Sequence, residues 1–299
     1  MANVMKVAEN GLVGALYLPS VTGRRPAVIV VGGSDGGLGS ALMYGEPIAR
    51  SGFVALCLAY FAMDGLPRHL SEIPLEYFGK AIDWLRVHPR VDRDRVGIFG
   101  SSRGGEAALV VAATFPSIRA VIANVPSHVV WQGINPDPAV KKSSWTFGGT
   151  PLPFASLVPP REGMTWREWF LASLEEGLVP REAAIPVERI NGPILFVTGT
   201  EDAVWPCSTM VDCAMERLQQ HGFRFAAEHA RYEGAGHAIL TPPYRVGPVE
   251  NPWPPDSYHQ PQWMRSNSPP LVLGGTAEAN RVARMDAWPR AVKFLENNL

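Results

Sequence analysis

Two segments of the sequence match the pattern G-x-S-x-G, which can place a serine in a tight turn as a nucleophile. They are residues 100–104 (GSSRG) and residues 32–36 (GGSDG). A serine of ordinary pKa attacks an acyl carbonyl only when a nearby base accepts its proton and a carboxylate orients that base. The two segments therefore predict acyl chemistry only where the rest of the sequence can supply those partners.

The segment around Ser102 has the context that a nucleophile elbow requires. Such an elbow is a strand that turns sharply into a helix, so that the helix N-terminus points toward the serine oxygen. The strand-like run VGIF at 96–99 precedes Ser102, and the helix-like run GEAAL at 105–109 follows it. Ser34 is instead followed by a glycine-rich loop with no immediate helix. Ser102 is therefore the predicted nucleophile.

The segment around Ser34 suits a different task in the same reaction. It follows the strand that normally carries the second oxyanion donor in hydrolases with this elbow. We expect the backbone N–H of Ser34 or Gly33, together with that of Arg103, to stabilise the negative oxygen of a tetrahedral intermediate. The alternative for residues 32–37 is a flexible glycine turn. The Arg103 side chain is expected to be exposed at the start of a helix, and substrate binding by this side chain is the alternative.

The base is expected to follow the nucleophile and the acid along the chain, in the order serine, carboxylate, histidine. Among seven histidines, His237 alone lies in a short loop directly after a predicted late strand, within YEGAGH at 232–237. The flanking glycines let its imidazole reach over the sheet edge. The other histidines precede Ser102, lie in irregular segments or suit the surface: His69, His88, His128, His221, His229 and His259.

The acid is expected in the turn after the predicted strand at 194–197, where two carboxylates are adjacent. Asp202 lies 100 residues after Ser102 and 35 residues before His237. Asp202 is favoured as the partner of the histidine, and spacing alone leaves Glu201 as the alternative.

Strand and helix patterns alternate along the chain, which indicates βαβ units and a mostly parallel sheet. The helical patterns are those at 73–88, where Pro74 suits the first turn, and at 106–114. The apolar, strand-like runs are those at 27–31, 54–58, 96–99, 120–123, 194–197 and 226–232. The pattern favours one α/β domain over residues 1–299.

Two irregular stretches interrupt this alternation, at about 127–186 and 241–272. The first is rich in aromatic residues and the second in proline, and long insertions of this kind are usually lids or binding loops. We expect the first to be a lid, and Trp131, Trp145 and Trp205 to contact substrate. The alternative is that both stretches are packed surface loops with the aromatic residues in the core.

Composition excludes several classes of protein. Apolar residues make up 46% of 299 and charged residues 18%, which is enough for a large core and excludes disorder. The formal net charge of −1 supplies no basic field for nucleic acid or an anionic membrane, so neither is an expected partner. No apolar run reaches 18 residues, and no signal peptide is predicted.

The three cysteines predict neither a disulfide framework nor a zinc site. Cys57 suits a buried thiol, and Cys207 and Cys213 lack histidine partners at ligand spacing. These features indicate a reduced, cytoplasmic protein that needs no metal or other cofactor and acts on a small-molecule acyl ester or thioester.

Further motifs connect the chain to a known family. The sequence contains ALCLAYF at 55–61, PLEYF at 74–78, DAVW at 202–205, GH at 236–237 followed by TPPY at 241–244, and GG at 274–275 leading into DAW at 286–288. With these motifs the chain resembles, over nearly its whole length, the C-terminal hydrolase domain of acyl-CoA thioesterases and bile-acid-CoA:amino-acid N-acyltransferases. Dienelactone hydrolases are more distant relatives. The resemblance implies an α/β-hydrolase fold with helices on both faces of the sheet and a lid-like insertion.

The resemblance also bears on the site and its reaction. In the family the acid lies three residues before the tryptophan that matches Trp205, which supports Asp202. The acyltransferases use a cysteine nucleophile, whereas this chain has Ser102, so hydrolysis is the expected reaction. The proline-rich stretch at about 245–270 is longer than in the family. Animal members carry a β-sandwich domain before this one, whereas the present sequence leaves room for one short leading hairpin.

Three alternatives to ester or thioester hydrolysis remain open from the sequence. They are acyl transfer to an amine or alcohol, hydrolysis of a lactone or carbon–carbon bond, and non-catalytic binding on the same fold. A CoA ester would need cations for its phosphates. The candidates in suitable regions are Arg68, Lys141, Lys142 and Arg161, each of which also suits an ordinary solvated charge.

Overall fold

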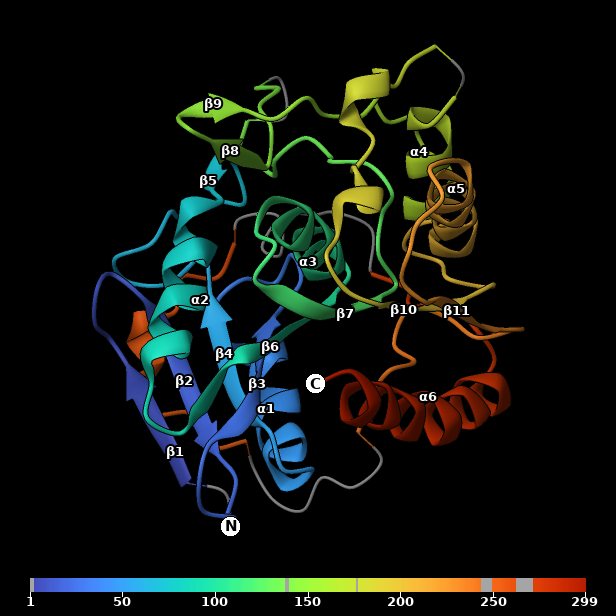
Figure 1. The fold of residues 1–299 in the computed structure, drawn as a ribbon. Helices are drawn as coiled ribbons and strands as arrows, with labels where there is room; N and C mark the ends of the chain where they lie inside the picture. Colours follow the sequence, from blue (N-terminus) through green and yellow to red (C-terminus); the bar gives the residue numbers. More distant parts are fainter. Residues whose placement is uncertain (1–2, 138–139, 176, 243–248, 262–270) are drawn as a thin grey trace.

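The computed structural model describes residues 3–137, 140–175, 177–242, 249–261 and 271–299. Its main sheet has eight strands in the order β1-β2-β4-β3-β6-β7-β10-β11 (Figure 1). The strands are β1 (Asn3–Val7), β2 (Val13–Leu18), β3 (Arg25–Val31), β4 (Val54–Ala59), β6 (Val91–Ser101), β7 (Ile118–Asn124), β10 (Ile194–Gly199) and β11 (Ala227–Tyr232).

The six strands from β4 to β11 are parallel, and the antiparallel pairs are β1–β2 and β2–β4. The β1–β2 pair is the expected short leading hairpin. All six predicted strands are present, because continuous apolar runs such as β4 are buried on both faces, as parallel strands are. The α/β-hydrolase fold is therefore confirmed.

Helices cover both faces of the sheet. The apolar side chains of α2 (Glu76–Val87), α3 (Arg103–Thr114) and most of α5 (Cys207–Gln220) join one core cluster. Those of α1 (Gly39–Arg50) and α6 (Ala277–Asn298) join the cluster on the opposite face. The carboxyl ends of the parallel strands all meet at one edge of this sandwich, where a site can be assembled from separate loops.

Two predicted helix starts differ from the structure. The first helix begins at Glu76, and Pro74 lies in the short strand β5 (Ile73–Pro74) instead of the first helical turn. The second begins at Arg103, three residues before the predicted start, because the sharp turn is confined to Ser102. The helix N-terminus therefore directly follows the candidate nucleophile.

The aromatic stretch at 127–186 has more regular structure than the sequence suggests. It contains β8 (Trp145–Phe147), β9 (Thr150–Pro151), α4 (Trp166–Ser173) and the 3-10 turn η1 (Arg181–Ala183), and the turn η2 (Val187–Arg189) follows it. β5, β8 and β9 form a separate small sheet. This small sheet and α4 lie together at one end of the molecule (Figure 1).

The proline-rich stretch is described at 241–242, 249–261 and 271–272, and its positions 243–248 and 262–270 lie outside the described residues. The part at 249–261 contains the short turn η3 (Pro255–Ser257) and packs against the β2 side of the sheet through Trp253, whose indole N–H donates to the Gly14 carbonyl at 2.7 Å. Over the described ranges, no helix has the length and apolar character needed to cross a membrane.

Candidate active site

Ser102 occupies a strained turn between β6 and α3. Its backbone has φ 58° and ψ −123°, a region that a residue with a side chain enters only at a cost of about 1–3 kcal/mol. Close packing forces this shape, because a Cβ atom on Gly100 would collide with the Gly104 carbonyl, and one on Gly104 would collide with the Gly32 carbonyl. The geometry is that of a nucleophile elbow.

The backbone of Ser102 is fixed from both sides. Its N–H donates to the Asn124 carbonyl at the end of β7 at 2.9 Å, and its own carbonyl accepts from the N–H groups of Gly105 and Glu106 at 2.8 and 3.1 Å. The N-terminal end of α3, with its partial positive charge, therefore lies at the serine.

The residues expected to supply the oxyanion hole lie beside Ser102. A Cβ atom on Gly33 would stand 3.4 Å from Cβ of Ser102, and Ser34 and Arg103 line the same cavity as Ser102. The Tyr60 hydroxyl donates to the Gly32 carbonyl at 2.8 Å and anchors the start of this loop. The structure thus brings together two segments that are about 70 residues apart in the sequence.

His237 and Asp202 form a hydrogen-bonded pair. Nδ1 of His237 lies 2.7 Å from Oδ2 of Asp202, whose side chain has no exposed surface. The other carboxylate oxygen accepts from the N–H groups of Val204 and Trp205 at 2.8 and 3.3 Å. The Asp202 carboxylate is therefore buried with its hydrogen bonds satisfied, and Glu201 is exposed beside it.

Three loops bring these residues to one edge of the sheet. Ser102 follows β6, Asp202 follows β10 and His237 follows β11, and all three strands run parallel in the same sheet. The His237 N–H donates to the Leu273 carbonyl at 2.7 Å, which holds the histidine loop against the chain that leads into α6. Nucleophile, base and acid candidates thus share the edge at which α/β proteins place their ligands.

A cavity of about 390 Å³ opens at Ser102. Most of its wall is aromatic or aliphatic, including Trp166, Trp169 and Phe170 from α4 and Trp205 from the loop after β10. The Phe170 ring makes edge contacts with Trp131 and Trp205, with centroids 4.9 and 5.4 Å apart. The aromatic stretch therefore forms one wall of the cavity, with α4 as its main element.

The predicted substrate contacts divide into two groups. Trp131 and Trp205 line the cavity, whereas Trp145 does not. Trp145 is fully buried, and its ring packs against Tyr60 and Phe78 at centroid distances of 5.7 and 6.0 Å. The expectation of a substrate contact for Trp145 is therefore corrected to a position in the core, where its large apolar ring is shielded from water.

The expectation of an exposed Arg103 side chain is wrong. Arg103 is only 5% exposed, and its guanidinium pairs with the fully buried Glu106 carboxylate at 2.7 Å. The guanidinium also donates to the Ser144 hydroxyl, and Glu106 accepts from the Trp145 indole N–H at 2.8 Å. Burial raises the pKa of Glu106, and the charge of Arg103 opposes that rise.

One turn of α3 makes this pair possible, because residues three apart lie on the same face of a helix. That spacing was the available sequence signal for the pair. The network it supports also reaches Gln132, which lines the cavity and accepts at its side-chain oxygen from the Leu157 N–H at 2.9 Å. Sequence reasoning missed Gln132, because nothing in its local sequence separates it from a surface glutamine.

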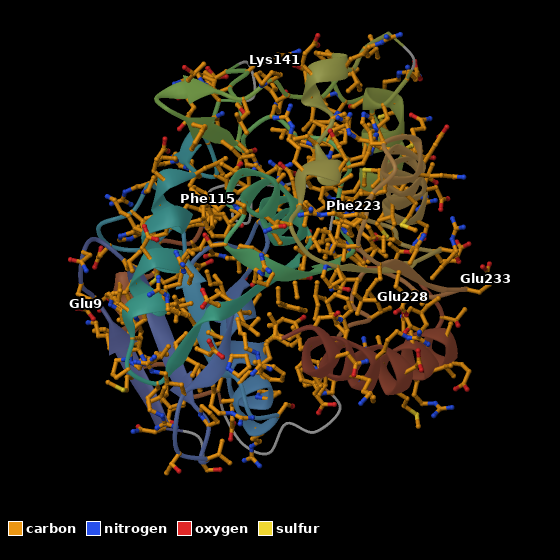
Figure 2. The ribbon with its side chains drawn as sticks, viewed as in Figure 1. Glu9, Phe115, Lys141, Phe223, Glu228 and Glu233 are labelled. Carbon is orange, nitrogen blue, oxygen red and sulfur yellow. The ribbon has the colours of Figure 1, made fainter. Side chains whose placement is uncertain are left out.

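The four candidate cations for CoA phosphates lie outside the cavity wall. Lys142 pairs with Glu72 at 2.5 Å, and Arg68, Lys141 and Arg161 are exposed. Lys141 lies at the end of the molecule that carries the small sheet (Figure 2).

Comparison with known proteins gives consistent results. Residues 73–299 match the family described as BAAT / acyl-CoA thioester hydrolase C terminal, and residues 2–137 match the PET hydrolase-like family. The mouse mitochondrial acyl-coenzyme A thioesterase 2 is 31% identical over 98% of this chain and 60% of its own length. The mouse acyl-coenzyme A amino acid N-acyltransferase 1 is 28% identical over 98% of this chain and 65% of its own length. The chain thus spans less than two thirds of the length of each of these relatives.

Solved structures resemble the chain in fold. A Klebsiella pneumoniae protein assigned to the dienelactone hydrolases superposes with a TM-score of 0.56 and 18% identity, covering 99% of this chain and 98% of that one. A dienelactone hydrolase-like promiscuous phosphotriesterase from metagenomic libraries gives a TM-score of 0.54 and 15% identity, covering 100% of this chain and 98% of that one.

Proposed function

Because the chain belongs to the BAAT / acyl-CoA thioester hydrolase C-terminal family, we propose that it is a serine hydrolase that cleaves an acyl thioester or a carboxylic ester. The observation that carries this proposal is the strained elbow at Ser102, at the sheet edge that also holds the His237–Asp202 pair. Strain of this kind persists where the surrounding structure imposes it, and it is typical of functional sites.

In the first half of the reaction, Ser102 attacks the acyl carbonyl carbon. The Ser102 hydroxyl proton passes to Nε2 of His237, while Asp202 holds Nδ1 and stabilises the imidazolium. Backbone N–H groups of Arg103 and of Ser34 or Gly33 stabilise the oxyanion of the tetrahedral intermediate. The intermediate collapses, and the thiol or alcohol leaves with the proton from His237.

In the second half, water replaces the leaving group. His237 takes a proton from water, whose oxygen attacks the acyl-enzyme carbonyl. The second tetrahedral intermediate collapses to the carboxylic acid, and Ser102 recovers its proton from His237. In this proposal His237 is the general base and general acid for every proton transfer in the cycle.

The cavity at Ser102 is proposed as the acyl site, and the aromatic stretch at 127–186 as its lid. The wall is mainly aromatic and aliphatic, and the Arg103 charge is neutralised by Glu106 beneath it. A site of this composition favours an apolar or aromatic acyl group over an anionic one, because Arg103, the cation among the described lining residues, is already paired with Glu106.

Acyl transfer is the second candidate, and the N-acyltransferase relative favours it. It would use the same acyl-enzyme but deliver the acyl group to an amine or alcohol in place of water. The serine at position 102 supports hydrolysis, since the resemblance assigns cysteine to the transferases. Product analysis with and without amine acceptors separates the two reactions.

The test is release of free thiol from a chain-length ladder of acyl-CoA esters by the full chain. Ser102→Ala is expected to abolish release, by removing the only atom that forms the acyl-enzyme. The matched control is Ser101→Ala, which removes the neighbouring hydroxyl that accepts from the Asn124 side chain at 2.8 Å. This control is expected to keep most activity.

Two outcomes would contradict parts of the proposal. Thiol release that survives Ser102→Ala would exclude a serine acyl-enzyme. No release from any CoA ester, with Ser102 still reactive toward a fluorophosphonate, would exclude the CoA thioesters and leave an oxygen ester or lactone as the substrate.

A further inference from the structure

The candidate oxyanion loop at 33–37 is covered by a residue from the proline-rich stretch. The Tyr258 hydroxyl donates to the backbone carbonyl of Asp35 at 2.7 Å. Its ring lies on Gly37, where an added Cβ atom would stand 2.6 Å from Cδ2 of Tyr258. Tyr258 is more than 220 residues from this loop in the sequence, so only the tertiary fold brings them together.

Tyr258 is itself held on a fixed support. Its neighbour Ser257 accepts at its carbonyl from the Asp64 N–H at 3.0 Å, and its other neighbour, His259, donates its N–H to the Ala62 carbonyl at 2.9 Å. Nε2 of His259 also lies 2.7 Å from Oδ1 of Asp64. Backbone pairing on both sides therefore fixes Tyr258 relative to the segment that follows β4.

Two adjacent glycines make the backbone of this loop conformationally permissive. Gly36 and Gly37 have φ values of 66° and 61°, and glycine enters this region at no steric cost but with many alternative conformations. An oxyanion donor stabilises the transition state only when it lies about 2.7–3.1 Å from the developing charge. A displacement of about 1 Å can cost up to about 100-fold in rate.

We propose that Tyr258 is a positioning residue for the second oxyanion donor, so that a residue of the proline-rich stretch sets the rate of the acyl reaction. This inference rests on the proposed serine hydrolase function. The Tyr258 hydroxyl fixes the Asp35 carbonyl and its ring confines Gly37, and the N–H groups of Gly33 and Ser34 lie directly before this clamped part of the loop.

The test is Tyr258→Phe, which keeps the ring on Gly37 and removes the hydroxyl that donates to the Asp35 carbonyl. We expect kcat to fall by about 10-fold with KM changed by less than about twofold, because the oxyanion donor acts on the transition state. A trifluoromethyl ketone inhibitor, which forms a tetrahedral oxyanion adduct with the serine, should lose affinity by a similar factor.

The matched control is Trp253→Phe in the same stretch. It also removes one side-chain hydrogen bond to a backbone carbonyl, that of Gly14 on β2, but it leaves the oxyanion loop untouched. We expect its kcat and its inhibitor affinity to equal those of the unaltered chain. Thermal unfolding of both variants shows whether either change loosens the whole fold.

Several results would overturn the inference. Unchanged kcat and unchanged inhibitor affinity in Tyr258→Phe would do so, and so would equal losses in Trp253→Phe. The rate of fluorophosphonate labelling of Ser102 gives the same comparison when no turnover substrate is available. Failure of the hydrolase proposal has a different signature, because labelling would then be absent, or would survive Ser102→Ala, in the unaltered background.

Discussion

Nδ1 of His237 lies 2.7 Å from Oδ2 of Asp202, a carboxylate with no exposed surface. In the proposed reaction, this pair orients the imidazole so that Nε2 can accept the serine proton. The hydrogen bonds from Val204 and Trp205 hold the same carboxylate from the other side.

Asp202→Asn tests this pair. The amide can donate to Nδ1 and hold the wrong tautomer, so kcat is expected to fall by about 10⁴-fold while the fold is kept. Stopped-flow or steady-state kinetics of the hydrolysis of an activated ester measures the fall in kcat. Glu201→Gln is the control, since this neighbouring carboxylate is exposed. A large loss in Glu201→Gln with little loss in Asp202→Asn would reverse the assignment of the acid.

Glu106→Gln tests the buried ion pair with Arg103. The change leaves a guanidinium that is only 5% exposed without its counter-charge, so the free energy of unfolding is expected to fall by about 3–5 kcal/mol. Urea unfolding measures the change. The double variant Arg103→Met, Glu106→Gln should recover part of it, because no unpaired charge remains. If Glu106→Gln lowers the free energy of unfolding by less than about 1 kcal/mol, the result would contradict a buried ion pair between Arg103 and Glu106.

Phe170→Ala tests the proposed acyl site. Phe170 contacts both Trp131 and Trp205, so the change enlarges the cavity and removes part of its aromatic wall. We expect kcat/KM for compact acyl groups to fall by at least about 10-fold and the preferred acyl group to become larger, at a stability cost of about 3–5 kcal/mol. Leu171→Ala, at an exposed position on the same helix, is the control. An unchanged acyl preference in Phe170→Ala would exclude this wall from the acyl site.

His128 predicts a specific loss of stability in acid. Burial lowers its pKa to about 4, from an ordinary value of 6.5, and its Nδ1 has no hydrogen-bond partner among the described residues. As the pH falls, His128 therefore binds a proton in the unfolded chain at a higher pH than in the folded protein. The contribution of the neutral imidazole is complete above pH 6.5 and is lost between pH 6.5 and 4.

The comparison is urea unfolding at pH 7 and pH 4.5 for the unaltered chain and for His128→Gln. Between pH 7 and pH 4.5, the free energy of unfolding of the unaltered chain is expected to fall by about 2 kcal/mol more than that of the variant. The reason is that one pKa unit corresponds to about 1.4 kcal/mol. Equal losses in the two proteins would show that His128 is not buried in its neutral form.

The sheet and the candidate triad follow from local sequence for a physical reason. A strand buried on both faces needs a continuous apolar run, and β3, β4 and β10 each have one. A strand-to-helix turn as tight as that at Ser102 requires glycines at 100 and 104. These are short-range constraints, so spacing and residue type predict them without knowledge of the partners.

The errors concern what surrounds a residue. Arg103 suggests exposure because an isolated guanidinium is costly to bury, but Glu106 one turn later neutralises it. Trp145 suggests a substrate contact, yet its ring fills a core pocket between Tyr60 and Phe78. Pro74 lies before the helix and not in its first turn, because β5 pairs with β8. Local helix propensity gives no information about that pairing.

The sequence by itself therefore determined the α/β-hydrolase class, the six central strands and the identities of Ser102, Asp202 and His237 as candidates. Only the tertiary structure decided that Asp202, and not Glu201, contacts the histidine, that Arg103 is buried, and that Tyr258 reaches the loop at Gly37. The physical reason is that burial and contact depend on segments far apart in the chain, whereas strand runs and tight turns depend on neighbouring residues.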